Sequence, residues 1–422
     1  MKKQTLKKLM FSGLAFTSIA TLAACGSGDN QKEATDEKGG KKLTISVAEG
    51  YADYVNDIKG DFEKENDVKI DVVEKDMFDT LDGLSLDGPA GKAPDVMMAP
   101  YDRIGSLGQQ GQIAEVKLGN EANYDDTDKA QVTTDGKLFG APAIIETIVF
   151  YWNKDLMPEA PTTFKELEAI AQDSKYAFPS EKGKNVGFLA KWTDFYFSYG
   201  LLAGYGGYVF GDNGTNPDEI GLNNEGSVEA IKYATKWFQD VWPKGMQDIT
   251  TNDNFMTEQF TTGKTAAIIG GPWAAQSYKE AGVNYGASVI PTLPNGEKYQ
   301  PFGGGKGWIV SNYSKNKEVA QEWLDYVTDQ ENQEKLYDMT NEVPANQAAR
   351  DYAKSKNDEL TTAVIEQYQT AQPMPNIPEM AEVWTGAENM MFDAGSGTKS
   401  PKEAADAAVK IIEEGIQQKY SK

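Results

Sequence analysis

A run of β-branched and aromatic residues at positions 144–151 is the feature that most constrains the fold of this chain. Such a run predicts a buried strand, and Gly140 and Pro142 mark its beginning. Glu146 interrupts the run, and a buried carboxylate is costly unless partners satisfy it. We therefore expect Glu146 to be hydrogen-bonded or to face a solvent-filled cleft, where the strand leaves one lobe and enters a second. A buried strand with one satisfied acid is the competing interpretation at this stage.

The chain is 422 residues long, which predicts two domains rather than one core. Strand and helix patterns alternate after residue 42, and this alternation predicts an α/β fold with a mostly parallel sheet covered by helices. Such sheets bind ligands at the carboxyl ends of their strands, and Asp102 and Arg103 lie just past one such end. The strands expected in this part are 43–47, 68–73 and 95–99, with helices at 51–65 and 102–110.

Further along the chain, Thr163 and Glu166 have the spacing of a capping box at the start of a helix. Residues 270–272 predict a sharp turn that holds Trp273 at the end of a strand. The Pro- and Gly-rich residues 291–305 are expected to form a connection between strands. Expected strands are 186–189, 265–269, 285–290 and 307–311, and expected helices are 227–242, 255–261, 318–327, 360–368 and 403–418.

Composition excludes several functional classes. The net charge is −23, which argues against nucleic-acid binding, and the absence of His removes imidazole bases, Ser-His-Asp catalysis and His metal sites. The glycine-rich stretches at 204–207, 263–265 and 303–307 lack the full spacing of phosphate-binding loops, and the acidic runs lack that of a calcium loop. We therefore expect no catalytic residue, cofactor or metal site.

The first 42 residues predict export and anchoring. Four lysines precede an apolar segment at 10–20 that is too short to span a bilayer, and Leu22-Ala23-Ala24-Cys25 follows it. This pattern resembles a bacterial lipobox, with a signal peptide at 1–24, lipidation of Cys25 and a flexible tether at 25–42. The expected location is the extracellular face of the bacterial cell membrane. An ordinary secretory signal with a chance cysteine is the alternative.

The aromatic residues divide into two groups. Tyr196, Trp273 and Trp384 lie beside Gly, Pro or polar residues, where a ring can stay partly exposed. Rings near carboxylates and an arginine suit sugars, because pyranose faces stack on the ring while charged groups take the hydroxyls. The other group is expected to pack in the interior: Trp152, Trp237, Trp242, Trp308 and Trp323.

Six stretches of the chain together resemble one family. They are PDVMMAPYDRIGSLGQQG at 94–111, GAPAIIETIVFYWNKDL at 140–156, DFYFSYGLLAGYGGYVF at 194–210, GGPWA at 270–274, VNYGASVIPT at 283–292 and MPNIPEMAEVW at 374–384. In this order they resemble the maltose/maltodextrin-binding proteins, the extracellular receptors of ABC sugar importers. The resemblance covers nearly all of the chain from residue 43 onward.

The resemblance implies a two-lobed, periplasmic-binding-protein-like (type II) α/β fold with a multi-strand hinge. Its N-terminal lobe would comprise 43–145 and 308–355, and its C-terminal lobe 146–307 and 356–422, with 146–150 and 303–307 at the hinge. The implied partners are maltose or maltodextrin and the permease subunits of an ABC transporter, with the receptor a monomer and not an enzyme. The implied sugar-binding residues are Asp102, Arg103, Glu146, Asp194, Tyr196, Trp273 and Trp384.

The chain departs from the family pattern at four positions. Ala99 and Ala275 stand where the family often has tryptophan, and Thr385 and Glu388 replace a tyrosine and an arginine. Fewer stacking platforms leave the preferred glucan length and exact sugar open. Two other functions stay open as well: a receptor of the same fold for another oligosaccharide, and a glycoside hydrolase that uses two of Asp102, Glu146 and Asp194.

Overall fold

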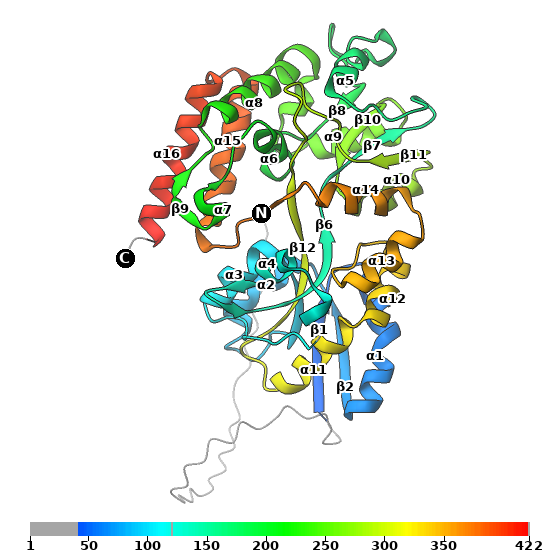
Figure 1. The fold of residues 1–422 in the computed structure, drawn as a ribbon, viewed down its shortest axis with the longest axis vertical. Helices are drawn as coiled ribbons and strands as arrows, with labels where there is room; N and C mark the ends of the chain where they lie inside the picture. The colour runs from blue at the N-terminus through cyan, green and yellow to red at the C-terminus, as the bar shows by residue number, and fades with distance from the viewer. Residues whose placement is uncertain (1–40, 120, 421–422) are drawn as a thin grey trace, which may run out of the picture. The chain divides into compact units, whose positions relative to one another are not determined.

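The computed structural model describes residues 41–119 and 121–420, and its first sheet has six strands (Figure 1). The strand order is β13-β12-β3-β1-β2, and β6 also pairs with β12, on the side of β12 opposite to β3. β1 is parallel to β2 and β3, whereas β12 is antiparallel to both β3 and β6. The strands are β1 Lys41–Val47, β2 Val68–Glu74, β3 Val96–Pro100, β6 Ala141–Glu146, β12 Phe302–Val310 and β13 Gln372–Pro373.

A second sheet of four strands has the order β11-β7-β10-β8. Its central strand β7 is antiparallel to both neighbours, and β10 is parallel to β8. These strands are β7 Val149–Asn153, β8 Phe188–Leu189, β10 Ala267–Gly270 and β11 Tyr285–Ser288. Two short strands, β4 Thr133–Thr134 and β5 Lys137–Leu138, form a separate hairpin, and β9 is Asn216–Ile220.

Helices cover both faces of the first sheet. Successive residues of a strand point to opposite faces, and in β12 Trp308 belongs to one apolar cluster while Ile309 belongs to another. Phe62 and Trp323 pack edge-to-face in the first cluster, with ring centroids 5.2 Å apart. The first cluster contains side chains of α1 Ala52–Asn66, α11 Lys317–Val327 and α12 Gln330–Thr340, and the second contains side chains of α2 Met77–Asp87 and α3 Tyr101–Gln109.

A third and larger apolar cluster surrounds the second sheet. Trp192, Trp237 and Trp242 lie at its centre together with Phe188, and α14 packs along β11 and β7. All five tryptophans expected in the interior are at most 9% exposed, which confirms their packing role. The remaining helices are α4 Asp126–Gln131, α5 Phe164–Ile170, α6 Phe195–Gly204, α7 Gly211–Gly214, α8 Glu225–Lys236, α9 Asn252–Thr261, α10 Ala275–Glu280, α13 Gln347–Ser355, α14 Glu359–Tyr368, α15 Val383–Ser396 and α16 Pro401–Tyr420.

The single strand expected at 144–151 is wrong. β6 ends at Glu146 and β7 begins at Val149, and the two strands belong to different sheets. Thr147 turns away from the ladder between them, and its hydroxyl donates to the carbonyl of Phe302 at 2.8 Å. The chain thus passes from one sheet to the other next to Glu146, as predicted, but it does so between two separate strands rather than along one.

The first sheet is mixed: the expected parallel arrangement holds for β1, β2 and β3, and β6 runs in their direction, but β12 and β13 run in the opposite direction. β12 begins at Phe302, inside the segment expected to be a connection. Glycine is needed there: at Gly305, where φ is +152°, a Cβ atom would lie 1.9 Å from the carbonyl oxygen of Ile144. The glycines that indicated a loop instead allow two strands to lie unusually close.

The capping box at Thr163 and Glu166 is confirmed, and both side chains make their reciprocal bonds. The other expected helices exist with shifted ends, and 227–242 ends in a π-helical turn. Eight helices of the described residues were not expected: α2, α4, α6, α7, α10, α12, α13 and α15. β1 begins at Lys41, so it includes the last two residues of the expected tether. The expected signal peptide, Cys25 and the rest of the tether lie outside the described residues. Within the described part, no helix is long and apolar enough to cross a membrane.

The packing of α3 leads to a stability prediction. A Cβ atom on Gly105 would lie 2.3 Å from the backbone oxygen of Asn376 and 2.5 Å from Thr134 Oγ1. We expect Gly105→Ala to lower the free energy of unfolding by about 1–3 kcal/mol, because overpacking outweighs the gain in helix propensity. Chemical denaturation of the unliganded protein measures this change.

The matched control is Gly60→Ala in α1, where a Cβ atom would meet nothing within 4 Å. This substitution should raise the free energy of unfolding by about 0.5–1 kcal/mol, because alanine loses less backbone entropy than glycine on entering a helix. Two changes of the same sign would contradict the close contact at Gly105.

Candidate functional site

A cavity of about 440 Å³ contains three of the seven expected sugar contacts: Asp102, Arg103 and Trp384. Asp102 and Arg103 lie in the first turn of α3, which begins where β3 ends. Trp384 lies in the first turn of α15, and its ring is edge-on to Phe195 at 5.9 Å between centroids. The further lining residues come from α2, α3 and the segment before α15: Leu81, Asp82, Ser85, Ser106, Leu107, Gln110, Gln112, Ile377, Pro378, Met380 and Ala381.

The segment before α15 is hydrogen-bonded to the end of α4, next to the helix α3 that carries Asp102. The side-chain amide of Asn376 donates to the backbone oxygens of Ala130 at 3.1 Å and Thr133 at 3.0 Å. These acceptors lie at and just after the end of α4, where helix carbonyls lack intrahelical partners. Together with the close contact at Gly105, this bond holds the chain before Trp384 against α3 and α4.

The two charged groups of this cavity differ in their environment. The guanidinium of Arg103 forms an ion pair with Asp82 of α2. Asp102 is half-buried, and burial raises its pKa to about 6, although the nearby charge of Arg103 opposes this rise. The cavity therefore offers one fixed cation and one carboxyl that changes charge near neutral pH.

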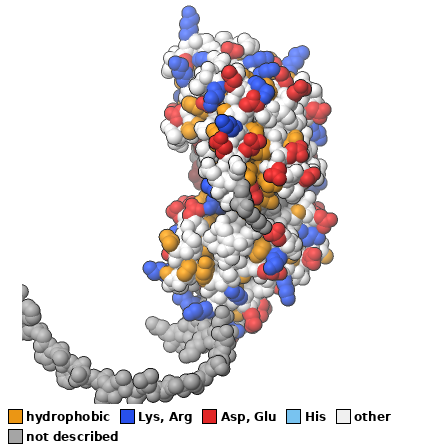
Figure 2. Space-filling view, turned by 90° about the vertical axis from the view of Figure 1, so that its left-hand side faces the viewer, with side chains coloured by type: hydrophobic (Ala, Val, Ile, Leu, Met, Phe, Trp, Pro, Cys, Tyr) orange, Lys and Arg blue, Asp and Glu red, His pale blue; other side chains and the backbone are white. Residues whose placement is uncertain are grey.

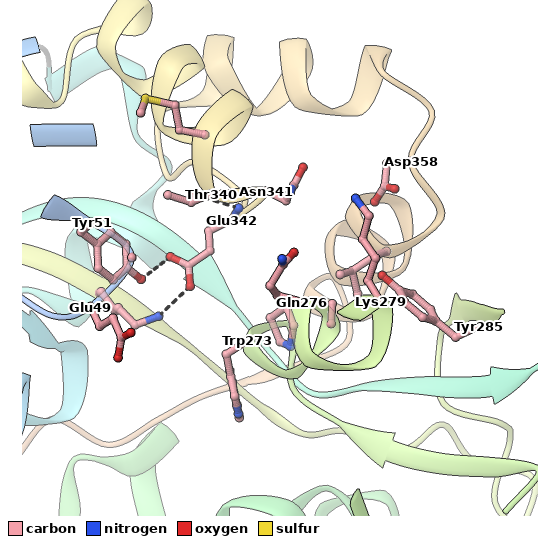
Figure 3. Close-up of a pocket in the computed structure, with 16 residues that line it drawn as sticks. Glu49, Tyr51, Trp273, Gln276, Lys279, Tyr285, Thr340, Asn341, Glu342 and Asp358 are labelled. Atoms are coloured by element: carbon pink, nitrogen blue, oxygen red, sulfur yellow. Dashed lines mark hydrogen bonds and ion pairs between the residues drawn. The ribbon is translucent and has the colours of Figure 1, made fainter. Parts of the chain in front are cut away.

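A second cavity, of about 540 Å³, contains Trp273 (Figure 3). The side chain of Trp273 is 47% exposed, so its ring is available for stacking. Tyr51 and Lys306 reach the same cavity from the first sheet and its connections, and Glu342 reaches it from the segment after α12. The other lining residues are Glu49, Gly50, Pro272, Ala275, Gln276, Lys279, Tyr285, Met339, Thr340, Asn341, Asp358 and Leu360.

Glu146 is hydrogen-bonded, as one of the two expectations for it required. Lys306 Nζ lies 2.6 Å from Glu146 Oε2 and 3.2 Å from Glu342 Oε1, and the hydroxyl of Tyr51 donates to Glu342. All three charged side chains are at most 15% exposed. Burial alone would lower the pKa of Lys306, but the two carboxylates outweigh burial and raise it well above its ordinary value. Lys306 is therefore cationic at neutral pH.

Tyr196 lines neither cavity but lies near residues of both. Its ring lies 6.0 Å from that of Trp273, measured between centroids. Burial raises the pKa of Tyr196 well above its ordinary value, and the charges of Glu146 and Asp102 raise it further, so Tyr196 lies near both of these acids. Its hydroxyl is buried and has no hydrogen-bond partner among the described residues. An unpaired buried hydroxyl is costly, so this oxygen is a candidate contact for a bound molecule.

Asp194 has a structural role at the beginning of α6. Its side chain caps the helix by accepting from the backbone N–H of Tyr196 at 2.9 Å, and it pairs with Lys191 at 3.1 Å. It lines neither cavity. Glu388, one of the departures from the family pattern, lies near Asp194. Burial is the main cause that raises the pKa of Glu388, and the negative charge of Asp194 raises it further.

The seven expected residues therefore do not surround one cavity. Three line the first cavity and Trp273 lines the second, whereas Tyr196, Glu146 and Asp194 line neither. Tyr196 lies beside Trp273, and Glu146 and Asp194 are paired with lysines. Sequence reasoning missed Tyr51, Lys306 and Glu342. The sequence signal for Lys306 is a single lysine among the glycines at 303–307, a stretch that lacks the spacing of a phosphate-binding loop.

Asp102 gives a prediction about pH. Its pKa is about 6 in the folded protein and 3.8 in its ordinary state, so between these values the folded protein binds more protons than the unfolded chain. This carboxyl therefore adds stability as the pH falls from neutral toward the ordinary value. We expect Asp102→Asn to gain less in free energy of unfolding between pH 7 and pH 5 than the wild type, measured by urea denaturation. Equal gains in both proteins would contradict the raised pKa.

Solved structures with this fold contain maltooligosaccharides. The maltose-binding protein MalE of Listeria monocytogenes, solved with maltose, is 72% identical, with a TM-score of 0.86, 90% of this chain and 99% of that chain covered. MalX of Streptococcus pneumoniae, solved with maltopentaose, is 55% identical, with a TM-score of 0.86 and 88% and 100% covered.

Sequence relatives agree with the structural ones. The maltodextrin-binding protein MdxE of Bacillus subtilis is 58% identical over 418 residues, which cover 99% of this chain and 100% of the relative. The model of a family described as bacterial extracellular solute-binding protein matches residues 57–363, well over half of the chain. The chain belongs to the family of bacterial extracellular solute-binding proteins.

Proposed function

We propose that this protein is a lipid-anchored extracellular receptor that captures maltose and maltodextrin and delivers them to the permease of an ABC transporter. The observation that carries the proposal is the exposed ring of Trp273 beside buried, charged side chains. A flat apolar surface next to charged hydrogen-bonding groups matches the two faces and the hydroxyl rim of a glucose unit. The relatives named as maltose- and maltodextrin-binding support the same ligand class.

The proposed site spans the two cavities. Asp102, Arg103 and Glu146 would hold sugar hydroxyls from one side, Asp194 and Tyr196 would approach from the other, and the rings of Trp273 and Trp384 would cover sugar faces. Tyr196 supports this arrangement, because its buried hydroxyl has no partner among the described residues and its ring lies beside that of Trp273. Asp194 would need to act from its capping position, so we expect its contribution to be the smallest of the seven.

Binding would proceed by closure of two lobes around the sugar. The proposed lobes are 43–145 with 308–355, and 146–307 with 356–422, and the hinge lies at 146–150 and 303–307. The change of sheet between β6 and β7, and the course of β12, support this division. Closure follows when the ligand contacts both lobes at once, because only the closed state makes both sets of contacts.

Anchoring is proposed through lipid on Cys25, followed by the tether, at the extracellular face of the cell membrane. The receptor would act as a monomer that presents closed, loaded lobes to the permease subunits. On the face drawn in Figure 2, Lys and Arg side chains are interspersed with Asp and Glu, so the described residues on that face form no broad basic patch. This supports the expectation that nucleic acid is not a partner.

A binding role is favoured over glycoside hydrolysis. The raised pKa of Asp102 would suit a general acid, but hydrolysis also needs a second carboxylate free to act as base or nucleophile. Glu146 and Asp194 are both held by lysines. Incubation with maltoheptaose and a reducing-sugar assay separates the two functions, since turnover would favour the enzyme and saturable binding without turnover the receptor. A calorimetric panel of other oligosaccharides tests a receptor of different specificity.

The exposed ring of Trp273 gives a binding prediction. Trp273→Ala should weaken binding of maltotriose by roughly fivefold or more, because a stacked ring contributes ~1 kcal/mol. Calorimetry measures this change, and the melting temperature of the unliganded variant should stay close to that of the wild type because about half of the side chain is exposed.

Tyr313→Ala is the control, since Tyr313 is a partly exposed ring outside both cavities. It should leave the affinity for maltotriose unchanged. Unchanged affinity in Trp273→Ala, or no binding heat from the wild type at millimolar maltotriose, would contradict the proposed site or the proposed function, respectively.

A further inference from the structure

The glycine-rich stretch 303–307 contains one lysine, Lys306, whose role the proposed contacts do not explain. Lys306 is only 12% exposed, and its ammonium group lies between carboxylates from two distant segments, Glu146 at the end of β6 and Glu342 after α12. Transferring three charged side chains out of water is costly, and a buried ion pair is weak evidence for a gain in stability. The three buried charges are therefore better explained by a role in positioning the two carboxylates than by a gain in stability.

The backbone of β12 is built to place this side chain. The pairing of β12 with β6 shifts register between Lys306 and Gly307, and such irregularities redirect a side chain and are common beside functional sites. Gly305 permits the close crossing at Ile144, as its Cβ contact shows. A Cβ atom on Gly307 would lie 3.1 Å from the carbonyl oxygen of Ala141. The glycines on both sides of Lys306 let the backbone approach β6 while the lysine alone carries a long side chain.

The hydrogen bonds leave acceptor capacity on both carboxylates. Lys306 binds Oε2 of Glu146 and Oε1 of Glu342, and Tyr51 donates to Oε2 of Glu342. A carboxylate has about four acceptor positions, so each group can accept more hydrogen bonds. Oε1 of Glu146 receives none from the described residues. Glu342 and Lys306 line the cavity that contains Trp273, and Figure 3 shows Glu342 and Tyr51 joined there.

We propose that Lys306 is a positioning residue that holds Glu146 and Glu342 in place, and that Glu342 is a further sugar contact that accepts hydroxyls of the unit stacked on Trp273. This inference rests on the proposed function. The ammonium group of Lys306 neutralises the two carboxylates and fixes their positions. Without it, the two acids would repel each other and turn away from the cavity. The aromatic face and the paired acids together would select a ring with hydroxyls along its edge.

The experiment is calorimetry with maltotriose on the wild type and four variants. Lys306→Met and Glu342→Gln should each weaken binding by at least about tenfold, and Lys306→Arg should recover most of the affinity, because arginine restores the cation between the two acids. Lys410→Met is the matched control. It removes the same charge from the surface of α16, where Lys410 is 74% exposed, and should bind like the wild type.

Thermal melting of the unliganded variants separates positioning from loss of fold. If Lys306→Met melts early, the double variant Lys306→Met/Glu342→Gln removes one of the two unpaired acids, and we expect it to regain melting temperature but not affinity. Affinity that returns together with the melting temperature would overturn the inference, because Lys306 would then act only on stability. Binding by Lys306→Met or Glu342→Gln within twofold of the wild type would overturn it as well. A wild type that binds no maltotriose would instead refute the proposed function.

Discussion

The close crossing of β12 and β6 is the contact on which the site depends. Gly305 brings the two backbones so near that a Cβ atom would overlap the carbonyl oxygen of Ile144. One residue later, the ammonium group of Lys306 binds Glu146 at the last position of β6. Immediately beyond Glu146, the chain leaves the first sheet and enters the second. The pairing of β12 with β6 thus buries a charge cluster and fixes the carboxylate at the point where the chain leaves the first sheet.

Most charged side chains of the proposed site are paired with a neighbour of opposite charge. Lys306 lies between two acids, Lys191 neutralises Asp194, and Arg103 is paired with Asp82. Groups fixed in this way lose little conformational entropy when a ligand binds, which favours affinity. Two groups differ from these: the hydroxyl of Tyr196 has no hydrogen-bond partner among the described residues, and burial raises the pKa of the Asp102 carboxyl.

Packing explains why these side chains keep their positions. The rings of Tyr199 and Phe302 stack with centroids 3.7 Å apart, and Phe302 is also in contact with Tyr196 and Trp384. Phe302 is the first residue of β12, so the strand that carries Lys306 also supports the rings that would contact sugar. Core packing and the binding surface therefore share one strand, and a change in either should be felt by the other.

The sequence alone determined the fold class, the interior tryptophans, most of the strands, half of the helices, and the motifs that pointed to a sugar receptor. These features depend on local periodicity, on turn residues or on long motifs, which can be read without coordinates. It did not determine the break between β6 and β7, the antiparallel course of β12 or the partners of Lys306. Glycines at 303–307 are compatible with a loop and with a close strand crossing, and only the position of β6 decides between them. Likewise, Glu146 and Glu342 are separated by almost two hundred residues, and only the folded sheet brings both acids to one ammonium group, because charge pairing across that separation has no local pattern.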